Sequence, residues 1–151
     1  MSKTDWSGKT IKGFGIKQFK SEDISENYIG WLNSQTVMEF SDNLPYGHNF
    51  STASNYLAQK LKAINEYFFI VYDTKTNFSI GSLTVSSICQ KDKTFDMGYI
   101  IGDTNYWGTN AGSNAIALGF EFCFNELKLR KHFGGISSSN LRARITAKKI
   151  G

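Results

Sequence analysis

The segment from Gly112 to Leu127 is the feature that most restricts how this chain can fold. Apolar side chains recur there at helical spacing, and further apolar residues fill the positions between them, so that nearly every side of the helix is hydrophobic. These residues are Ile116, Ala117, Leu118, Phe120, Phe122, Cys123, Phe124 and Leu127. A helix of this kind has to be buried by other elements of the chain.

The residues before this helix show two helical patterns followed by three strands. The expected elements are a strand at Phe14 to Phe19, a helix capped by Ser21 with Ile24, Tyr28, Ile29 and Leu32 on one face, and a helix capped by Ser51 with Ala53, Leu57, Leu61 and Ile64 on one face. The strands are Tyr67 to Tyr72, Phe78 to Ile88 and Thr94 to Ile101. This alternation predicts an α+β protein.

Two further elements are expected after the buried helix. One is a short strand at His132 to Ser137, and the other is a helix at Asn140 to Lys149 with Leu141, Ile145 and Ala147 facing inward. The complete order is βααβββαβα. With 151 residues, no repeat and no linker-like tract, residues 1–151 are expected to form one domain.

Composition and charge argue against several other classes of protein. No apolar run approaches the roughly 20 residues that a bilayer helix needs, and Met1 to Lys9 does not resemble a secretory signal, so we expect no membrane association and a cytoplasmic location. Cys89 and Cys123 show no CxxC spacing, so no metal site is expected. A net charge of +4 is too modest and scattered for a nucleic-acid surface. The basic clusters at 128–132 and 142–149 are either a solvated face or partners of an anionic cofactor.

The loop from Gly102 to Gly112 is the best candidate for a binding site. It leaves a strand and leads directly into a helix that begins with small residues. The first turn of a helix exposes backbone N–H groups, and glycines let a phosphate approach the main chain, so this geometry suits a pyrophosphate. The loop contains neither GxGxxG nor GxxxxGK[ST], the spacings of the two familiar nucleotide-binding loops.

Several short motifs together resemble one known family. They are Gly98-Tyr99-Ile100-Ile101-Gly102-Asp103, Tyr106-Trp107-Gly108, Trp31-Leu32-Asn33, Asn125-Glu126-Leu127, Asn140-Leu141-Arg142-Ala143 and Lys149-Ile150-Gly151. From about Phe14 to Gly151 the chain resembles the GNAT acetyltransferases, in particular the branch that acetylates ribosomal-protein N-termini, polyamines and amino sugars. The resemblance implies a central, mostly antiparallel sheet with helices on both faces. Relatives continue past the residue matching Gly151 with two more strands, which are missing here.

The resemblance also implies acetyl-CoA as cofactor and suggests which residues hold it. The residues that match the family's cofactor contacts are Tyr99, Ile100, Ile101, Trp107, Gly108, Thr109, Asn110, Ala111, Gly112, Ser113 and Asn140. For Trp107 and Gly108 the alternative is a plain turn with a buried aromatic ring, and for Asn140 it is a helix N-cap, which is compatible with a ligand contact. The family usually has glycine at the position of Asn110, and Asn is the least costly substitute if the backbone must adopt φ > 0.

Candidates for catalysis and for acceptor binding follow from the same comparison. Asp96 precedes Trp107 by eleven positions (107 minus 96), where histone-acetylating relatives place a glutamate base; the alternative is an exposed strand residue. His48 could take the amine proton, or be structural. Trp31, Phe40 and Tyr46 are expected at the acceptor walls or in ordinary packing. The tyrosine that protonates the leaving thiolate in many relatives is replaced by Ala147.

The expected activity is transfer of an acetyl group from acetyl-CoA to a primary amine by direct attack in a ternary complex. The amine is a protein N-terminus, an amino sugar or another small amine. The alternative, suggested by Asn110, Asn114 and Ala147, is a weak or inactive protein of the same fold that binds acetyl-CoA or a protein partner. Without the last strands, the strand at His132 to Ser137 would leave an open sheet edge, which favours a homodimer.

Overall fold

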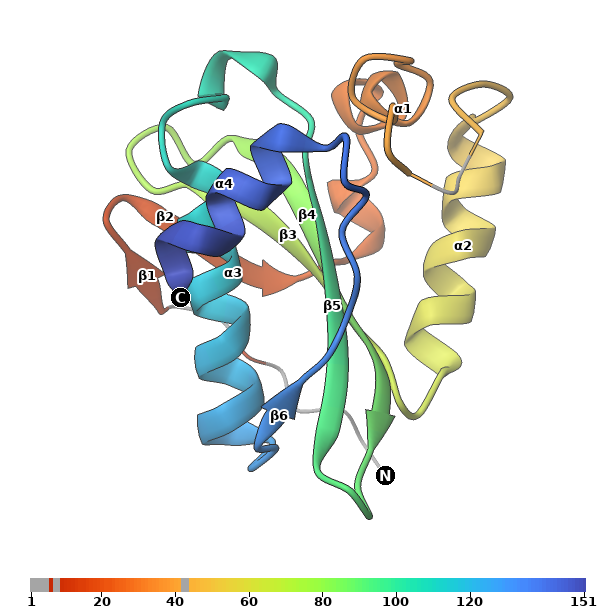
Figure 1. Ribbon diagram of the computed structural model, residues 1–151. Helices are drawn as coiled ribbons and strands as arrows, with labels where there is room; N and C mark the ends of the chain where they lie inside the picture. Colours follow the sequence, from red (N-terminus) through yellow and green to blue (C-terminus); the bar gives the residue numbers. More distant parts are fainter. Residues whose placement is uncertain (1–5, 7–8, 42–43) are drawn as a thin grey trace.

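The centre of the computed structural model is one six-stranded sheet whose strands lie side by side in chain order (Figure 1). The structure describes Trp6, residues 9–41 and residues 44–151. The strands are β1 (Thr10–Ile11), β2 (Phe14–Gln18), β3 (Tyr67–Asp73), β4 (Ser79–Cys89), β5 (Thr94–Ile101) and β6 (Lys131–His132). Neighbouring strands are antiparallel except for β5 and β6, which are parallel. The expected mostly antiparallel sheet is confirmed.

Helices cover both faces of this sheet, as expected. Helices α1 (Glu26–Leu32) and α2 (Phe50–Lys62) lie on one face, and α3 (Ala111–Glu121) lies on the other with α4 (Leu141–Ile150) packed across it (Figure 1). Within the described part of the chain, no helix is long and apolar enough to cross a membrane.

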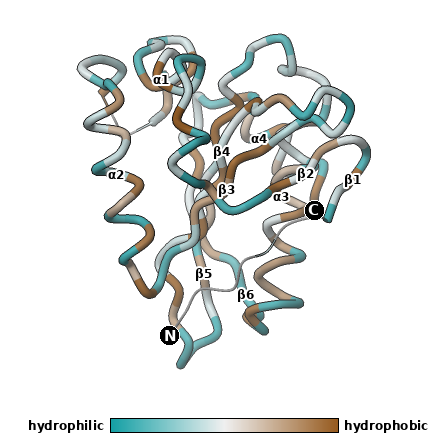
Figure 2. Tube along the Cα trace, turned by 180° about the vertical axis from the view of Figure 1, so that it is seen from behind, coloured by the Kyte–Doolittle hydropathy of each residue, from teal (hydrophilic) through white to brown (hydrophobic). Residues whose placement is uncertain are grey.

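The larger of two hydrophobic cores lies between the sheet and α3. Phe69, Leu83 and Val85 from the strands pack there with Leu118 and Phe122, and all five are essentially inaccessible to solvent. A smaller core between the sheet and helices α1 and α2 contains Tyr28, Leu57, Phe68 and Ile70. The hydrophobic stretches accordingly concentrate along β3 and β4 at the centre of the molecule (Figure 2). The predicted burial of the helix after Gly112 is confirmed as far as Cys123, whereas Phe124 near its end is 40% exposed.

Strand alternation gives β4 two different faces. Leu83 and Val85 point toward α3, whereas Ser82 and Thr84 point to the opposite face, beneath α1 and α2, because successive side chains of a strand alternate. This alternation places a polar strip on the face of the sheet that carries the site described below.

The two N-terminal helices begin at other residues than expected. Helix α1 is capped by Ser25, whose hydroxyl accepts the Tyr28 N–H at 3.1 Å, while Ser21 opens a separate 3-10 turn (Ser21–Asp23). Helix α2 is capped by Asn49 and not by Ser51. The Asn49 side chain accepts the Thr52 N–H, and the Thr52 hydroxyl accepts the Asn49 N–H, which satisfies two helix-end donors at once.

Several expectations about apolar side chains were wrong. Leu61 and Ile64 are 44% and 87% exposed, because α2 ends at Lys62 and only its Ala53 and Leu57 side is covered. In α4, Leu141 and Ile145 are 62% and 46% exposed, since the helix lies over α3 and not over the sheet.

The strand order also needs two corrections. The expected order lacked β1, which forms a hairpin with β2 through Lys12 and Gly13, both at positive φ. The expected strand at His132 to Ser137 is reduced to Lys131–His132, because the chain leaves β5 after Phe133 and crosses toward α4. The buried helix changes to π geometry over Phe122–Glu126.

Candidate functional site

A cavity of about 890 Å³ opens on β4 and β5, with α1 and α2 on one flank and α3 and α4 on the other. It brings together most of the residues that the sequence singled out. Its lining includes Phe40, His48, Asp96, Tyr99, Ile100, Ile101, Trp107, Gly108, Asn110, Ala111, Gly112, Ser113 and Asn140. Thr109, Trp31 and Tyr46 are not part of the lining.

Two adjacent aromatic side chains fix the loop before α3 to the sheet. The Tyr106 hydroxyl donates to Asp73 Oδ2 at 2.6 Å, and the Trp107 indole Nε1 donates to the Ile101 carbonyl at 2.8 Å. The first of these bonds lowers the pKa of Asp73 and raises the pKa of Tyr106, because it favours the carboxylate and the neutral phenol. Trp107 is therefore more than a buried turn residue, since it also lines the cavity.

The N-terminus of α3 presents unused backbone donors to this cavity. Asn110 has φ 69°, so it occupies the left-handed conformation that glycine adopts most readily and asparagine at little cost. Its carbonyl accepts the Asn114 N–H at 3.0 Å, and the preceding N–H groups of Ala111, Gly112 and Ser113 have no acceptor within the helix. Together with the helix dipole, these donors create a positive potential that suits an anion.

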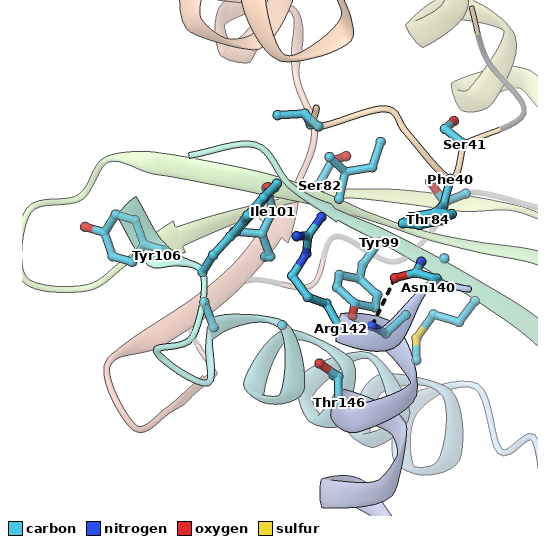
Figure 3. A pocket seen from close by; sticks show the side chains of 18 of the residues that line it. Phe40, Ser41, Ser82, Thr84, Tyr99, Ile101, Tyr106, Asn140, Arg142 and Thr146 are labelled. Atoms are coloured by element: carbon cyan, nitrogen blue, oxygen red, sulfur yellow. Dashed lines mark hydrogen bonds between the residues drawn. The ribbon is translucent and has the colours of Figure 1, made fainter. Parts of the chain in front are cut away.

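Helix α4 adds two positive charges beside these donors. Lys149 Nζ donates to Asn110 Oδ1 at 2.7 Å, and the Arg142 guanidinium lies 3.8 Å from the centre of the Trp107 ring. Figure 3 shows Arg142 extending from α4 toward Ile101. Neither cation forms an ion pair with another described residue. The sequence offered only the basic cluster at 142–149 as a hint of this role.

The start of α4 follows the expectation for Asn140. Its side-chain oxygen accepts the Ala143 N–H at 3.2 Å, so it is an N-cap, and it also lines the cavity. Thr146, which lies next to Ala147, lines the cavity as well and provides a hydroxyl group on this side of α4 (Figure 3). No motif or spacing in the sequence points to Thr146.

Beyond its first residues, the edge of β5 on the side of the cavity pairs with no other strand in the described part of the chain. Strand β6 pairs only with Thr94 and Phe95, and the Phe133 N–H donates to the Phe95 carbonyl at 2.9 Å. The Ile101 carbonyl faces the same side, where it accepts from Trp107, whereas the Gly102 N–H points back to Ile80 of β4. Because backbone groups alternate along a strand, the N–H groups of Tyr99 and Ile101 face the open edge, and the backbone groups of Ile100 face β4.

Asp96 lies in the cavity wall, where Met97 of its own strand and His132 of β6 contact its carboxylate. Its Oδ1 accepts the Met97 N–H at 2.7 Å and lies 3.7 Å from Nε2 of His132. A Cβ atom at Gly134 would lie 2.5 Å from the same oxygen, so a larger residue there would displace the carboxylate. With 40% of its side chain accessible, Asp96 is both anchored and open to the cavity.

His48 lines the cavity, and its backbone is held by hydrogen bonds. Its N–H and carbonyl both bond to the Asn33 side chain at 3.0 Å, and its ring Nε2 lies 2.7 Å from the Leu44 carbonyl. A carbonyl can only accept, so Nε2 carries a proton, which leaves Nδ1 as the ring's acceptor.

The two remaining acceptor candidates lie outside the cavity. The Trp31 ring covers Gly102, where it leaves no room for a Cβ atom, and it borders a separate hollow with Asp103 and Phe78. Tyr46 is 65% exposed. Phe40 is therefore the only one of the three predicted aromatic walls that lines the main cavity among the described residues.

Other reactive side chains do not compete for a role in this site. Burial raises the pKa of the Cys123 thiol to about 12, so it stays protonated inside the core. Burial likewise raises the pKa of Tyr28, which lines the cavity as a neutral phenol. Among the residues that the structure describes, no cluster of three or more His, Cys, Asp or Glu side chains could hold a metal ion.

Solved structures of known proteins share this architecture. Spermidine N-acetyltransferase from Vibrio cholerae, solved with CoA and spermine, superposes with a TM-score of 0.81 at 18% identity, over 93% of this chain and 81% of the other. An acetyltransferase of the GNAT family from Bacillus anthracis gives 0.80 at 18% identity, over 97% and 82%. At this level of identity the likeness concerns the fold.

The sequence itself matches a family model. A comparison with curated protein sequences found no match. The model described as the acetyltransferase (GNAT) domain, however, matches residues 14–151, which is nearly the whole chain and includes every element that lines the cavity. The chain therefore belongs to the GNAT family of N-acetyltransferases.

Proposed function

We propose that this protein transfers an acetyl group from acetyl-CoA to a primary amine, by direct attack of the amine while both substrates are bound. The acceptor is a protein N-terminus, an amino sugar or another small amine. The observation that carries the proposal is a single cavity that combines the helix α3 N-terminus, two unpaired cations and the open edge of β5. Membership of the family supports the same reaction.

The residues present fit a long ligand with phosphate groups at one end. The N–H groups of Ala111, Gly112 and Ser113 and the charges of Arg142 and Lys149 suit the pyrophosphate. Glycine at position 112 leaves the little space that exists at this end, because a Cβ atom there would lie only 3.0 Å from the Tyr99 ring. The edge of β5 suits the amide groups of a pantetheine arm, which can pair with it like an added strand.

Acetyl-CoA, when bound, supplies an acetyl group on a thioester. The N–H groups of Tyr99 and Ile101 are the donors placed to polarise its carbonyl oxygen, because they face the open edge within the cavity. The Thr146 hydroxyl lies on the α4 side and is available to the leaving sulfur, in place of the tyrosine that Ala147 replaces. A thiol of ordinary pKa, about 8.5, leaves without much assistance.

An amine attacks only when it is neutral, so the site needs a proton acceptor. Asp96 is favoured, since its carboxylate is anchored in the cavity wall and one oxygen is not committed to the Met97 N–H. His48 is the second candidate, since the bond from its Nε2 to the Leu44 carbonyl leaves Nδ1 as the nitrogen that could take the proton.

Thiol release in the presence of acetyl-CoA and a panel of primary amines tests the proposal. We expect turnover with at least one amine, and calorimetry should show CoA binding. Asp96→Asn should lower kcat about a hundredfold while leaving CoA affinity nearly unchanged, since its role concerns the amine. A loss below about twofold would move the role to water or His48.

Two arginines of α4 provide a matched control for the cofactor end. Arg142→Ala should weaken CoA binding about tenfold or more, because it removes a charged partner of the phosphates. Arg144 is exposed and donates to the Ser138 carbonyl outside the cavity, so Arg144→Ala should change the affinity less than about twofold. CoA binding without thiol release for any amine would instead support a binding protein of this fold.

A further inference from the structure

A row of three hydroxyl groups lines the acceptor half of the cavity. Ser82, Thr84 and Ser86 alternate along β4 on the face beneath α1 and α2, and all three line the cavity. Figure 3 shows Ser82 and Thr84 on the cavity side of the sheet. None of the three hydroxyls has a hydrogen bond to another described residue. Each hydroxyl oxygen therefore stays accessible from the cavity, where a polar ligand can bond to it.

The strand opposite this row leaves space for such a ligand. Ser82, Thr84 and Ser86 pair across the ladder with Ile100, Gly98 and Asp96. A Cβ atom at Gly98 would meet nothing within 4 Å, so the floor is open between Ile100 and Asp96. The row therefore runs beside the strand that faces the thioester and ends next to the proposed proton acceptor.

The charges that line the cavity limit the acceptor further. Asp96 is the only carboxylate among the described lining residues, and the two cations Arg142 and Lys149 would pair with the cofactor phosphates under the proposed function. A ligand with several ammonium groups would leave all but one of them without a carboxylate partner in the cavity wall, which is unfavourable. A ligand with one amine and several hydroxyls matches the lining.

We propose, on the basis of the N-acetyltransferase function above, that the acceptor is a primary amine that carries several hydroxyl groups and one positive charge. Asp96 receives the amine, and Ser82 and Thr84 bond to the hydroxyl groups. Amino alcohols and amino sugars belong to this class, whereas polyamines do not.

Serinol and isopropylamine test the inference, because they share a carbon skeleton and differ only in hydroxyl groups. The wild-type protein should acetylate serinol with a kcat/KM at least about tenfold higher, and glucosamine should also be turned over. Ser82→Ala and Thr84→Val should each lower kcat/KM for serinol about three- to tenfold and leave that for isopropylamine within about twofold. The basicity of each amine cancels in this double comparison.

Two controls show that a loss is specific. Ser79 lies on the same strand but outside the main cavity, so Ser79→Ala should leave both amines unaffected. CoA affinity by calorimetry should be unchanged in all three variants, which shows that the fold is intact.

A further variant tests the space beside the row of hydroxyls. Gly98→Val should fill the open floor and abolish turnover of both amines while CoA still binds.

The inference is overturned if spermidine has a higher kcat/KM than serinol and glucosamine. It is also overturned if Ser82→Ala and Thr84→Val lower the values for serinol and isopropylamine equally. In both cases thiol is released, so the N-acetyltransferase function stands. Absence of thiol release with every amine would remove both proposals.

Discussion

Asn110 combines a left-handed backbone conformation with a side chain that binds a cation. Its φ of 69° costs little for asparagine but about 1–2 kcal/mol for most other non-glycine residues. Its side-chain oxygen accepts Lys149 Nζ at 2.7 Å and so keeps this ammonium beside the helix N-terminus. The residue therefore affects both the stability of the loop and the position of a charge.

Replacement of Asn110 by glycine should tighten CoA binding about fivefold, that is by about 1 kcal/mol. Glycine accepts the same φ, removes bulk near the phosphates and frees Lys149 to bind them. Asn110→Ala also frees Lys149 but should lower the free energy of unfolding by about 1 kcal/mol, because alanine is strained at this φ. Calorimetry and urea denaturation separate the two effects. Weaker binding by the glycine variant would show that the bond to Asn110 positions Lys149 for the ligand.

The bond between Tyr106 and Asp73 should make stability depend on pH at both extremes. The pKa of Asp73 is lowered below its ordinary 3.8, so its contribution is present above that pH and is lost as the pH falls through the folded-state value. The pKa of Tyr106 is raised above 10.0, so its contribution is present below that pH and is lost as the pH rises through the folded-state value. Tyr106→Phe removes the contribution of Tyr106 and the largest part of that of Asp73, whose carboxylate keeps its bond from the Lys75 N–H.

Urea denaturation of wild type and Tyr106→Phe at about pH 3, 7 and 11 measures this effect. The difference in unfolding free energy should be largest near neutrality and smaller at each extreme. An equal difference at all three values would mean that the bond has no linked proton.

At the scale of single residues, the sequence predicted local backbone features better than contacts between distant side chains. The left-handed backbone at Asn110 and the N-cap at Asn140 are confirmed, because both depend on local chemistry. The contacts of Arg142 with Trp107 and of His132 with Asp96 join residues far apart in the chain. No spacing rule predicts which side chains such distant segments bring together.

At the scale of elements, the unpaired edge of β5 should be visible by hydrogen exchange. The N–H groups of Tyr99 and Ile101 face the cavity, so they should exchange fast in the free protein and slow down when CoA binds. The N–H groups of Gly98 and Ile100 face β4 and provide an internal reference that is protected in both states. Unchanged exchange at Tyr99 and Ile101 with CoA bound would contradict the pairing of the ligand with this edge.

Elements with a strong periodic pattern were predictable, and short ones were not. Strand β5 was located to the residue, and α3 was found because its buried length carries a clear pattern. Strands β1 and β6 contain two residues each, too few for any pattern to show. The inward face of α4 was predicted from the apolar residues Leu141 and Ile145, which are exposed, while the charged residues Arg142 and Lys149 line the cavity.

At the scale of the whole molecule, the edge beyond β6 should promote association of two copies. The exposed side chains of Phe133, Ile136 and Leu141 follow this short strand, at 47%, 48% and 62% exposure. Apolar groups next to a sheet edge favour pairing with another chain. Sedimentation velocity should therefore show a dimer that dissociates on dilution.

Charged substitutions test where this association takes place. Ile136→Lys should shift the protein to the monomer, because it places a charge in the proposed contact. Ile64→Lys, at a site that is 87% exposed next to α2, should not. A wild-type monomer at every concentration would contradict the prediction.

The open edge of β5 also ties the stability of the fold to the supply of its ligand. A ligand that binds only the folded chain adds RT ln(1 + [L]/Kd), about 2.7 kcal/mol at a hundredfold excess over Kd, against a total of about 5–15 kcal/mol for ordinary domains. Under the proposed function, the pantetheine arm that pairs with β5 is the same before and after acetyl transfer, and only the acetyl carbonyl is lost. Resistance to unfolding would then follow mainly the total concentration of CoA in both forms, with a smaller dependence on the fraction that is acetylated.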